Sequence, residues 1–207
     1  MKKIKILLGD PRHNTVGSHS NYVPIGIGYI GSNLKKQFEK SNNEIELKLA
    51  TDPREIFNIL EKWKPNVIGL SNYVWNSDLS YLICLHAKKL NPETLCILGG
   101  PEFPAGTGAF KIQNTSEDKT YDKCLTYLTK RPAVDYFAYS DGEVSFLQVV
   151  KKFVKNNFSV KLMKNKNVPI KGCANLSKDK NSLLVGSYMP RIGLDGSVKK
   201  EGRDVIP

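Results

Sequence analysis

The sequence predicts an α/β fold in which helices cover both faces of a parallel β-sheet. Over the first three quarters of the 207-residue chain, short apolar runs of strand length alternate with segments whose apolar residues recur at helical spacing. Two apolar runs end in glycine-bearing loops, at residues 99–102 and 140–143, and glycine lets a backbone approach a large ligand closely. The alternation predicts the fold class, and the two loops indicate a ligand-binding edge.

The individual elements follow from the same pattern. Apolar residues recur every three or four positions over residues 27–38, and the next helix begins at Pro53, whose fixed φ suits a first helical turn. Helical spacing returns over residues 79–90, 118–130 and 146–154. The predicted strands between these helices cover residues 3–8, 44–50, 67–70, 95–98 and 134–139.

Five strands joined by helices predict one doubly wound sheet. Parallel crossovers are right-handed and place helices on both faces. We therefore expect the strand order 2-1-3-4-5, the flavodoxin-like (Rossmann-like) arrangement, in which ligands bind at the carboxyl ends of the strands.

The last quarter of the chain has a different composition. From about residue 158 it is rich in Lys, Asn, Gly and Ser, with strand candidates at residues 183–185 and 189–192 and a turn signal at Asp195-Gly196. We expect two units, an α/β domain over residues 1–157 and a small β-rich extension and linker over residues 158–207. The final residues, 204–207, resemble a linker.

Charge and cysteine spacing exclude several classes of function. The net charge is +11, but the lysines are scattered and accompany no nucleic-acid recognition motif, so we expect no nucleic-acid partner. Four cysteines without C-x-x-C spacing argue against a disulfide scaffold and against a compact zinc or iron–sulfur site, and we predict no metal ligands. Cys84 and Cys96 lie among Leu and Ile and are expected to be buried.

The chain shows no signal for a membrane. Its longest apolar runs have strand length, and the N-terminus enters a strand rather than the apolar segment of a signal peptide. We expect a cytoplasmic protein.

A literal G-x-G-x-x-G occurs at Gly26, Gly28 and Gly31, and Asp52 follows at the end of the second predicted strand. In a dinucleotide-binding fold these residues would hold the pyrophosphate and the ribose of a nicotinamide or flavin cofactor. That motif belongs in a tight turn directly after the first strand, whereas a long segment separates Leu8 from Gly26. The glycines fall inside a helix, where they would thin one face for close packing.

Four motifs occur in an order that points to a known family. They are P-x-G-x-x-Y at 24–29, K-P-x-V-I-G-L-S at 64–71, G-G-P-E at 99–102 and D-Y-F-A-Y-S-D-G-E at 135–143. In this order and spacing, residues 1–157 closely resemble the cobalamin-binding domain at the N-terminus of many radical S-adenosylmethionine enzymes.

The resemblance implies a site for cobalamin. Ser71 and Asn72 would make polar contacts, and Gly99 and Gly100 would let the corrin rim or nucleotide tail pass close to the backbone. The aromatic segment 73–75 would lie against a corrin face, or would be core packing or a lid without a cofactor. The acids Glu102 and Glu143 could equally stabilise helix N-termini. The predicted cofactor-binding residues are Pro24, Gly26, Ser71, Asn72, Tyr73, Val74, Trp75, Gly99, Gly100, Pro101, Glu102, Asp141, Gly142 and Glu143.

A histidine ligand to cobalt is not predicted. Related cobalamin domains carry D-x-H-x-x-G after the first strand, whereas this loop reads D-x-x-H-x-x-x-G from Asp10 to Gly17. A ligand histidine must be oriented by its neighbours, so the changed spacing places His13 off register. His19 is expected in solvent and His86 in a structural role on a helix. The resemblance therefore implies cobalamin bound without a protein histidine.

The sequence lacks the residues for radical chemistry of its own. No C-x-x-x-C-x-x-C motif is present to hold a [4Fe–4S] cluster, so we expect a non-catalytic binding module. The resemblance implies a radical S-adenosylmethionine catalytic domain as partner, in cis or in trans, and a chain that stops before the iron–sulfur barrel. Two alternatives stay open: the dinucleotide-binding enzyme domain, and a scaffold or docking domain that binds no ligand.

Overall fold

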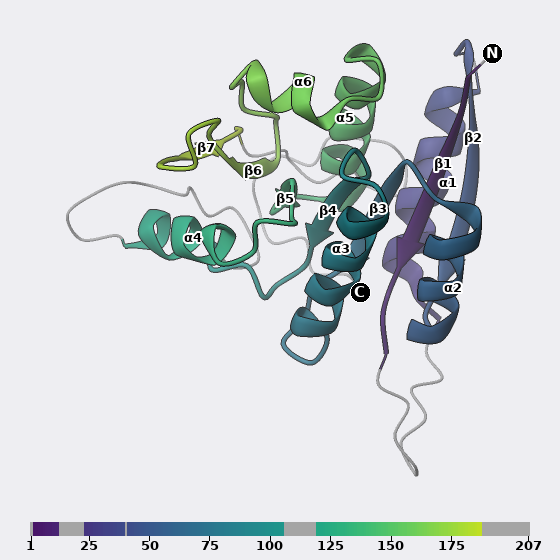
Figure 1. The fold of residues 1–207 in the computed structure, drawn as a ribbon, viewed down its shortest axis with the longest axis horizontal. Helices are drawn as coiled ribbons and strands as arrows, with labels where there is room; N and C mark the ends of the chain where they lie inside the picture. Colours follow the sequence, from purple (N-terminus) through teal and green to yellow (C-terminus); the bar gives the residue numbers. More distant parts are fainter. Residues whose placement is uncertain (1, 13–22, 40, 106–118, 188–207) are drawn as a thin grey trace, which may run out of the picture.

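The computed structural model of the protein describes residues 2–12, 23–39, 41–105 and 119–187 (Figure 1). The elements run in the order β1 (Lys2–Gly9), α1 (Ile25–Phe38), β2 (Asn43–Ala50), α2 (Pro53–Trp63), β3 (Val67–Ser71), α3 (Ser77–Leu90), β4 (Leu95–Gly99), α4 (Thr120–Thr129), β5 (Tyr136–Ala138), α5 (Gly142–Lys155), α6 (Val160–Asn165), β6 (Cys173–Leu176) and β7 (Leu183–Val185). The predicted alternation of strands and helices is confirmed.

One sheet contains all the described strands, in the order β2-β1-β3-β4-β5-β6-β7. The first five strands pair in parallel and follow the order 2-1-3-4-5, whereas β5–β6 and β6–β7 pair antiparallel. The prediction of a five-stranded sheet is therefore wrong, because the described part of the sheet has seven strands. The predicted order 2-1-3-4-5 is only the first part of the observed strand order. β6 was missed because a run of four residues without β-branched or aromatic side chains gives a weak strand signal.

Two hydrophobic layers form because successive side chains of each strand point to opposite faces. Leu7 of β1 packs with α2, α3 and α4, whereas Ile6 and Leu8 pack with α1, α5 and α6. Figure 1 shows α2 and α3 in front of the strands and α1 behind them. The sheet is thus covered on both faces, as predicted.

The region after residue 157 continues this sheet. α6 is a single short helix capped by the Ser159 hydroxyl, which accepts a hydrogen bond from the Leu162 amide at 3.2 Å. β6 then pairs with β5, and β7 matches the predicted strand at 183–185. The other expected features of this region, at 189–192, Asp195-Gly196 and 204–207, lie outside the described residues. The division of the chain at residue 157 stays a prediction.

Candidate ligand-binding site

The loops predicted to bind a ligand meet at one edge of the sheet. β1, β3, β4 and β5 are neighbours and run in parallel, so their carboxyl ends lie side by side. We call this region the carboxyl edge: residues 10–12, 71–76, 99–102 and 140–143, together with residues 23–29 at the start of α1. In Figure 1 it faces the lower part of the view. Every predicted cofactor-binding residue lies in one of these segments.

A polar network joins the ends of β1 and β3. The Ser71 hydroxyl donates to Asp10 Oδ1 at 2.5 Å, and Asn76 Nδ2 donates to Ser71 Oγ at 3.0 Å and to the Pro11 carbonyl at 3.1 Å. Asn76 Oδ1 also accepts from the Tyr73 amide at 2.8 Å. Ser71 is therefore anchored at the edge by protein side chains, and its predicted contact with a cofactor stays a prediction. Sequence reasoning missed Asp10 and Asn76, although one directly follows a strand and the other directly precedes a helix.

Asn72 joins β3 to β4. Its amide donates to the Gly99 carbonyl at 2.8 Å, and its own carbonyl accepts from the Glu102 amide at 3.2 Å. The Asn72 side chain is fully buried, and its Nδ2 donates to the Tyr127 hydroxyl at 2.8 Å. Asn72 thus stabilises the edge from the interior of the protein. Its side-chain partner Tyr127 belongs to α4, and sequence reasoning did not connect this residue with the site.

The close approach of the backbones after β3 and β4 requires a glycine at position 100. Its φ is +141°, a conformation that side-chain-bearing residues rarely adopt, and an added Cβ would lie 2.5 Å from the Asn72 carbonyl oxygen. Gly99 is less crowded, because its added Cβ would meet the Ala138 carbonyl at 3.4 Å. Position 100 therefore requires glycine, whereas position 99 has more space for a side chain.

Aromatic packing anchors the chain that follows Gly100. Phe103 is buried and stacks on Phe137 of β5, with ring centroids 4.2 Å apart, and meets Tyr127 edge-on at 5.4 Å. Burial raises the pKa of the Tyr127 hydroxyl, although hydrogen bonds to it act in the opposite direction. Pro101 is exposed, and Glu102 precedes no helix in the described part of the chain. The interpretation of Glu102 as a helix-capping acid is therefore not supported.

The segment after Ser71 and Asn72 exposes an apolar surface. Tyr73 and Trp75 stack in parallel, with ring centroids 4.5 Å apart and planes 7° from each other. Val74 is 75% exposed and Trp75 is 54% exposed. The alternative that these two side chains belong to the core is wrong, because they lie at the surface beside the polar network of the edge.

The start of α1 adds further exposed apolar side chains to the edge. Val23, Ile25 and Tyr29 are all exposed, and Pro24 occupies the position before the first helical residue. No described atom lies within 4 Å of a Cβ added at Gly26 or Gly28. The backbone of this first turn is therefore accessible as well.

The glycines of the G-x-G-x-x-G sequence lie inside α1, as predicted. Gly31 is buried, and its added Cβ would lie 2.6 Å from Leu47 Cδ2, so the close-packing interpretation is confirmed there. It is wrong for Gly26 and Gly28, which face open space. β1 ends at Gly9 and α1 begins only at Ile25, so the motif does not form the tight turn that dinucleotide binding needs.

Asp52 has a structural partner. Its carboxylate accepts from the Arg54 amide at 2.8 Å and pairs with the Arg54 guanidinium at 2.9 Å, which caps the N-terminus of α2. The hydrogen bond from the Arg54 side chain holds the pKa of Asp52 below its ordinary value. Together with the position of the glycines, this argues against the dinucleotide interpretation.

The β5–α5 loop completes the edge. Asp141 occupies the position before α5, and Glu143 lies in the first helical turn, where a negative charge interacts favourably with the helix dipole. The Glu143 carbonyl accepts from Asn33 Nδ2 at 2.7 Å, and a Cβ added at Gly142 would lie 2.9 Å from Ile30 Cδ1. These contacts fix the loop against α1, so the two helices flanking the edge are held together.

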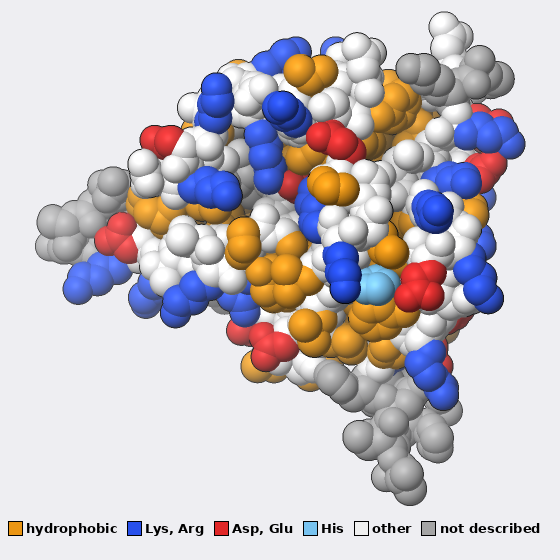
Figure 2. Space-filling model, viewed as in Figure 1, with side chains coloured by type: hydrophobic (Ala, Val, Ile, Leu, Met, Phe, Trp, Pro, Cys, Tyr) orange, Lys and Arg blue, Asp and Glu red, His pale blue; other side chains and the backbone are white. Residues whose placement is uncertain are grey.

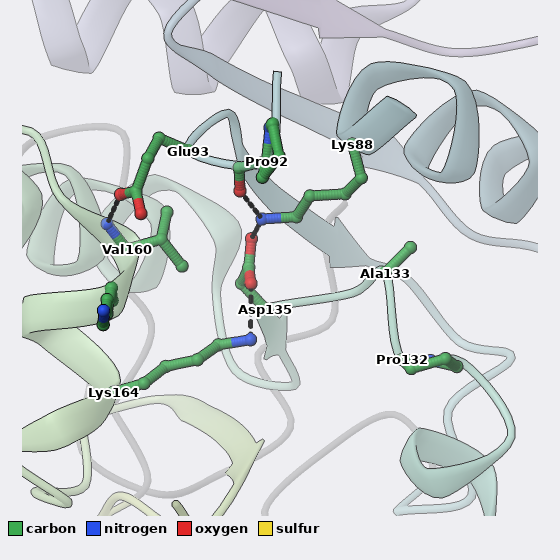
Figure 3. A pocket seen from close by; sticks show the side chains of 9 residues that line it. Lys88, Pro92, Glu93, Pro132, Ala133, Asp135, Val160 and Lys164 are labelled. Carbon is green, nitrogen blue, oxygen red and sulfur yellow. Dashed lines mark hydrogen bonds and ion pairs between the residues drawn. The ribbon is translucent and has the colours of Figure 1, made fainter. Parts of the chain in front are cut away.

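A separate pocket of about 440 Å³ lies at the opposite edge of the sheet. Figure 3 shows Lys88 and Lys164 reaching the buried Asp135 from two sides, and each Nζ lies 2.6 Å from one carboxylate oxygen. The Cys96 amide donates to the same carboxylate at 2.8 Å, and Glu93 accepts from the Val160 amide at 2.6 Å. This pocket contains an ion-pair network that attaches α3 and α6 to the start of β5, far along the strands from the carboxyl edge.

The cysteines of the protein lie in its interior. The four cysteines form no disulfide and are buried, which confirms the prediction for Cys84 and Cys96. Burial raises the pKa of Cys96 and of Cys173. Within the described ranges, no three His, Cys, Asp or Glu side chains are grouped so as to hold a metal ion, and His13 and His19 fall outside those ranges. His86 lies on α3, with Nε2 3.3 Å from Glu61 Oε1.

Lysine and arginine side chains are spread around the visible face in Figure 2 and are interrupted by acidic and apolar ones. None of the described helices combines the length and the apolar character that crossing a membrane requires.

Parts of this chain are similar to known proteins. No protein-family model matches the chain. The cobalamin-dependent radical SAM methyltransferase TokK of Streptomyces tokunonensis is 30% identical over 87 residues, which make up 42% of this chain and 10% of that protein. A novel cobalamin-binding protein from Desulfitobacterium hafniense DCB-2 superposes with a TM-score of 0.44 and 16% identity, over 72% of this chain and 58% of that one. The chain thus matches only a small part of the length of its curated relative.

Proposed function

We propose that this chain is a cobalamin-binding module that operates with a radical S-adenosylmethionine catalytic domain. The observation that carries the proposal is the exposure of large apolar side chains on two segments of the carboxyl edge: Val74 and Trp75 after β3, and Ile25 and Tyr29 at the start of α1. Doubly wound sheets bind their ligands at this edge. The sequence similarity to part of a cobalamin-dependent enzyme supports the choice of ligand.

The residues present fit the chemistry of a corrin. A corrin is apolar on its two faces and carries amides around its rim, so its site needs a flat apolar surface next to backbone donors and acceptors. The stacked pair of Tyr73 and Trp75 offers such a surface. The first turn of α1 at Gly26, the Gly99–Glu102 turn and the Asp141–Glu143 loop belong to the same edge and would make the polar contacts. Ser71 would orient this surface through its bonds to Asp10 and Asn76.

The proposed mode of binding uses no histidine of the protein as a cobalt ligand. Among the described residues of the carboxyl edge there is no histidine, and His86 is engaged with Glu61 and Phe57 on the helical layer. When bound, a corrinoid would supply a methyl group for transfer or assist another radical step. This chain would hold and orient it, and the proposed partner domain would carry the iron–sulfur cluster and perform the catalysis.

The first test is anaerobic incubation with hydroxocobalamin, followed by gel filtration and a visible absorption spectrum of the protein peak. We expect about one equivalent of retained corrinoid. An unchanged spectrum in His13→Ala would exclude this histidine as a ligand. A colourless peak would overturn the proposal for this chain. Retention of a nicotinamide or flavin cofactor instead would support the dinucleotide alternative, and retention of no cofactor would support a scaffold.

Two exposed side chains make a matched pair for locating the site. Trp75 is 54% exposed and belongs to the carboxyl edge, whereas Leu82 is 55% exposed on the outer face of α3. Trp75→Ala is expected to weaken hydroxocobalamin binding about tenfold or more, since aromatic anchors contribute strongly to binding. Leu82→Ala should leave the affinity unchanged. Equal affinities for both variants would place the corrinoid elsewhere.

A further inference from the structure

The β5–α5 loop is held by residues that follow it by about 30 positions. The Gly172 carbonyl accepts hydrogen bonds from two consecutive amides, those of Tyr139 at 3.0 Å and Ser140 at 3.2 Å. These two residues immediately precede Asp141, Gly142 and Glu143, where the loop enters α5. One carbonyl therefore determines where the chain leaves β5.

Gly172 can do this only as glycine. Its φ is +73°, and a Cβ added there would collide with the Ser145 hydroxyl and lie 3.1 Å from the Ser140 Cβ. The Ser145 hydroxyl itself has no hydrogen-bond partner among the described residues. Gly172 thus packs tightly against α5 at the Ser145 hydroxyl, which no described hydrogen bond holds in place.

Further contacts tie this glycine to the β6–β7 hairpin. The Gly172 amide donates to the Ser187 carbonyl at 2.8 Å, and the Gly186 amide donates to the Cys173 carbonyl at 2.9 Å. The Tyr139 hydroxyl donates to the Gly186 carbonyl. The loop at the carboxyl edge is therefore bonded at Gly172 and again at Gly186.

We propose that residues 170–187, with Gly172 at their centre, are a positioning element for the ligand-binding edge. The element holds the β5–α5 loop in place. Through this loop it positions the start of α5 beside the other loops of the carboxyl edge. A loop whose backbone must meet a ligand rim needs this support, because small displacements weaken a preorganised site. The proposal rests on the proposed cobalamin-binding function. It assigns to the β-rich extension a role in binding that the composition of this segment does not suggest.

The test measures two properties of the full chain for each variant: hydroxocobalamin affinity by spectral titration, and amide hydrogen exchange of residues 139–143 without ligand. Gly172→Ala is expected to weaken binding about tenfold and to accelerate exchange in this loop. Ile56→Val, a buried change in α2, is the control. It should lower the melting temperature while leaving both the affinity and the exchange of residues 139–143 at wild-type values.

Two milder variants keep the proposal falsifiable if Gly172→Ala fails to fold. Tyr139→Phe removes only the hydroxyl bond to Gly186 and should give a smaller change in the same direction. Ser145→Ala should be neutral alone and should restore part of the affinity when combined with Gly172→Ala, because it removes the nearest colliding atom. A double variant that binds no better than Gly172→Ala would count against the proposal.

The outcomes separate this inference from the function on which it rests. If the wild-type chain binds no hydroxocobalamin, the proposed function fails, and unchanged loop exchange in Gly172→Ala would overturn the positioning role as well. If the wild type binds and Gly172→Ala binds equally well, the positioning role is overturned while the function stands.

Discussion

Replacing Gly100 by alanine tests the close approach of β3 and β4 at the carboxyl edge. Two costs arise in the folded state. The φ of +141° is unfavourable for alanine, and strained backbone conformations cost of the order of 1–3 kcal/mol. The new Cβ would also lie 2.5 Å from the Asn72 carbonyl oxygen and 3.0 Å from its nitrogen, and such overpacking costs roughly 1–3 kcal/mol. The lower entropy of the unfolded alanine chain offsets about 0.4–1 kcal/mol of this.

The expected net loss is about 2–5 kcal/mol, a large share of the roughly 5–15 kcal/mol by which a domain is stable. The assay is urea unfolding followed by far-UV circular dichroism. Gly28→Ala is the matched control, since it lies inside α1 with no described atom within 4 Å of the new Cβ. That variant should gain about 0.5–1 kcal/mol from helix propensity. Midpoints for Gly100→Ala at or above wild type would refute the reasoning.

Three further predictions concern other parts of the molecule. Asp135→Asn leaves two lysines without their buried carboxylate and should cost about 3–5 kcal/mol in urea unfolding, while hydroxocobalamin affinity stays unchanged. Asp52→Ala should cost about 1 kcal/mol at pH 7 through the lost helix cap. Because Arg54 lowers the pKa of folded Asp52 below 3.8, that difference should persist above this pH and disappear as the pH falls through the folded-state value. A thiol reagent should not label the native protein, because all its cysteines are buried: Cys84, Cys96, Cys124 and Cys173. After denaturation it should label all four, and rapid labelling of the native protein would contradict their burial.

The sequence predicts the parallel part of the sheet well because that part depends on local patterns. Apolar runs of strand length and helical spacing define β1 to β4 and their helices to within one or two residues. The fifth strand is shorter than predicted, Tyr136–Ala138 rather than residues 134–139. Asp135, within the predicted range, is instead held by lysines of α3 and α6, a tertiary contact that no local pattern reveals.

The same limit applies to the candidate site. Glycines and small polar residues after apolar runs predict which loops reach the carboxyl edge. They do not predict which side chains face outward there. Asn72 and Trp75 are only three positions apart, yet the Asn72 side chain is fully buried and Trp75 is 54% exposed. The burial of Asn72 depends on Tyr127, 55 residues further along the chain, so it follows from the fold and not from the segment.

The carboxyl edge is built in two layers, one polar and one apolar. Beneath lies a fixed polar layer, in which Ser71 bonds to Asp10 and Asn72 bonds to Tyr127 and to the β4 turn. Above it lies an apolar layer containing the stacked Tyr73–Trp75 pair, at the surface. Exposed aromatic surface costs free energy in water, and a rigid base prevents it from folding inward. The hydrogen bonds of Ser71 and Asn72 tie the lower layer to the sheet, so the stacked aromatic pair is held at the surface of the free protein, where it would offer a preorganised apolar face to the corrinoid we propose.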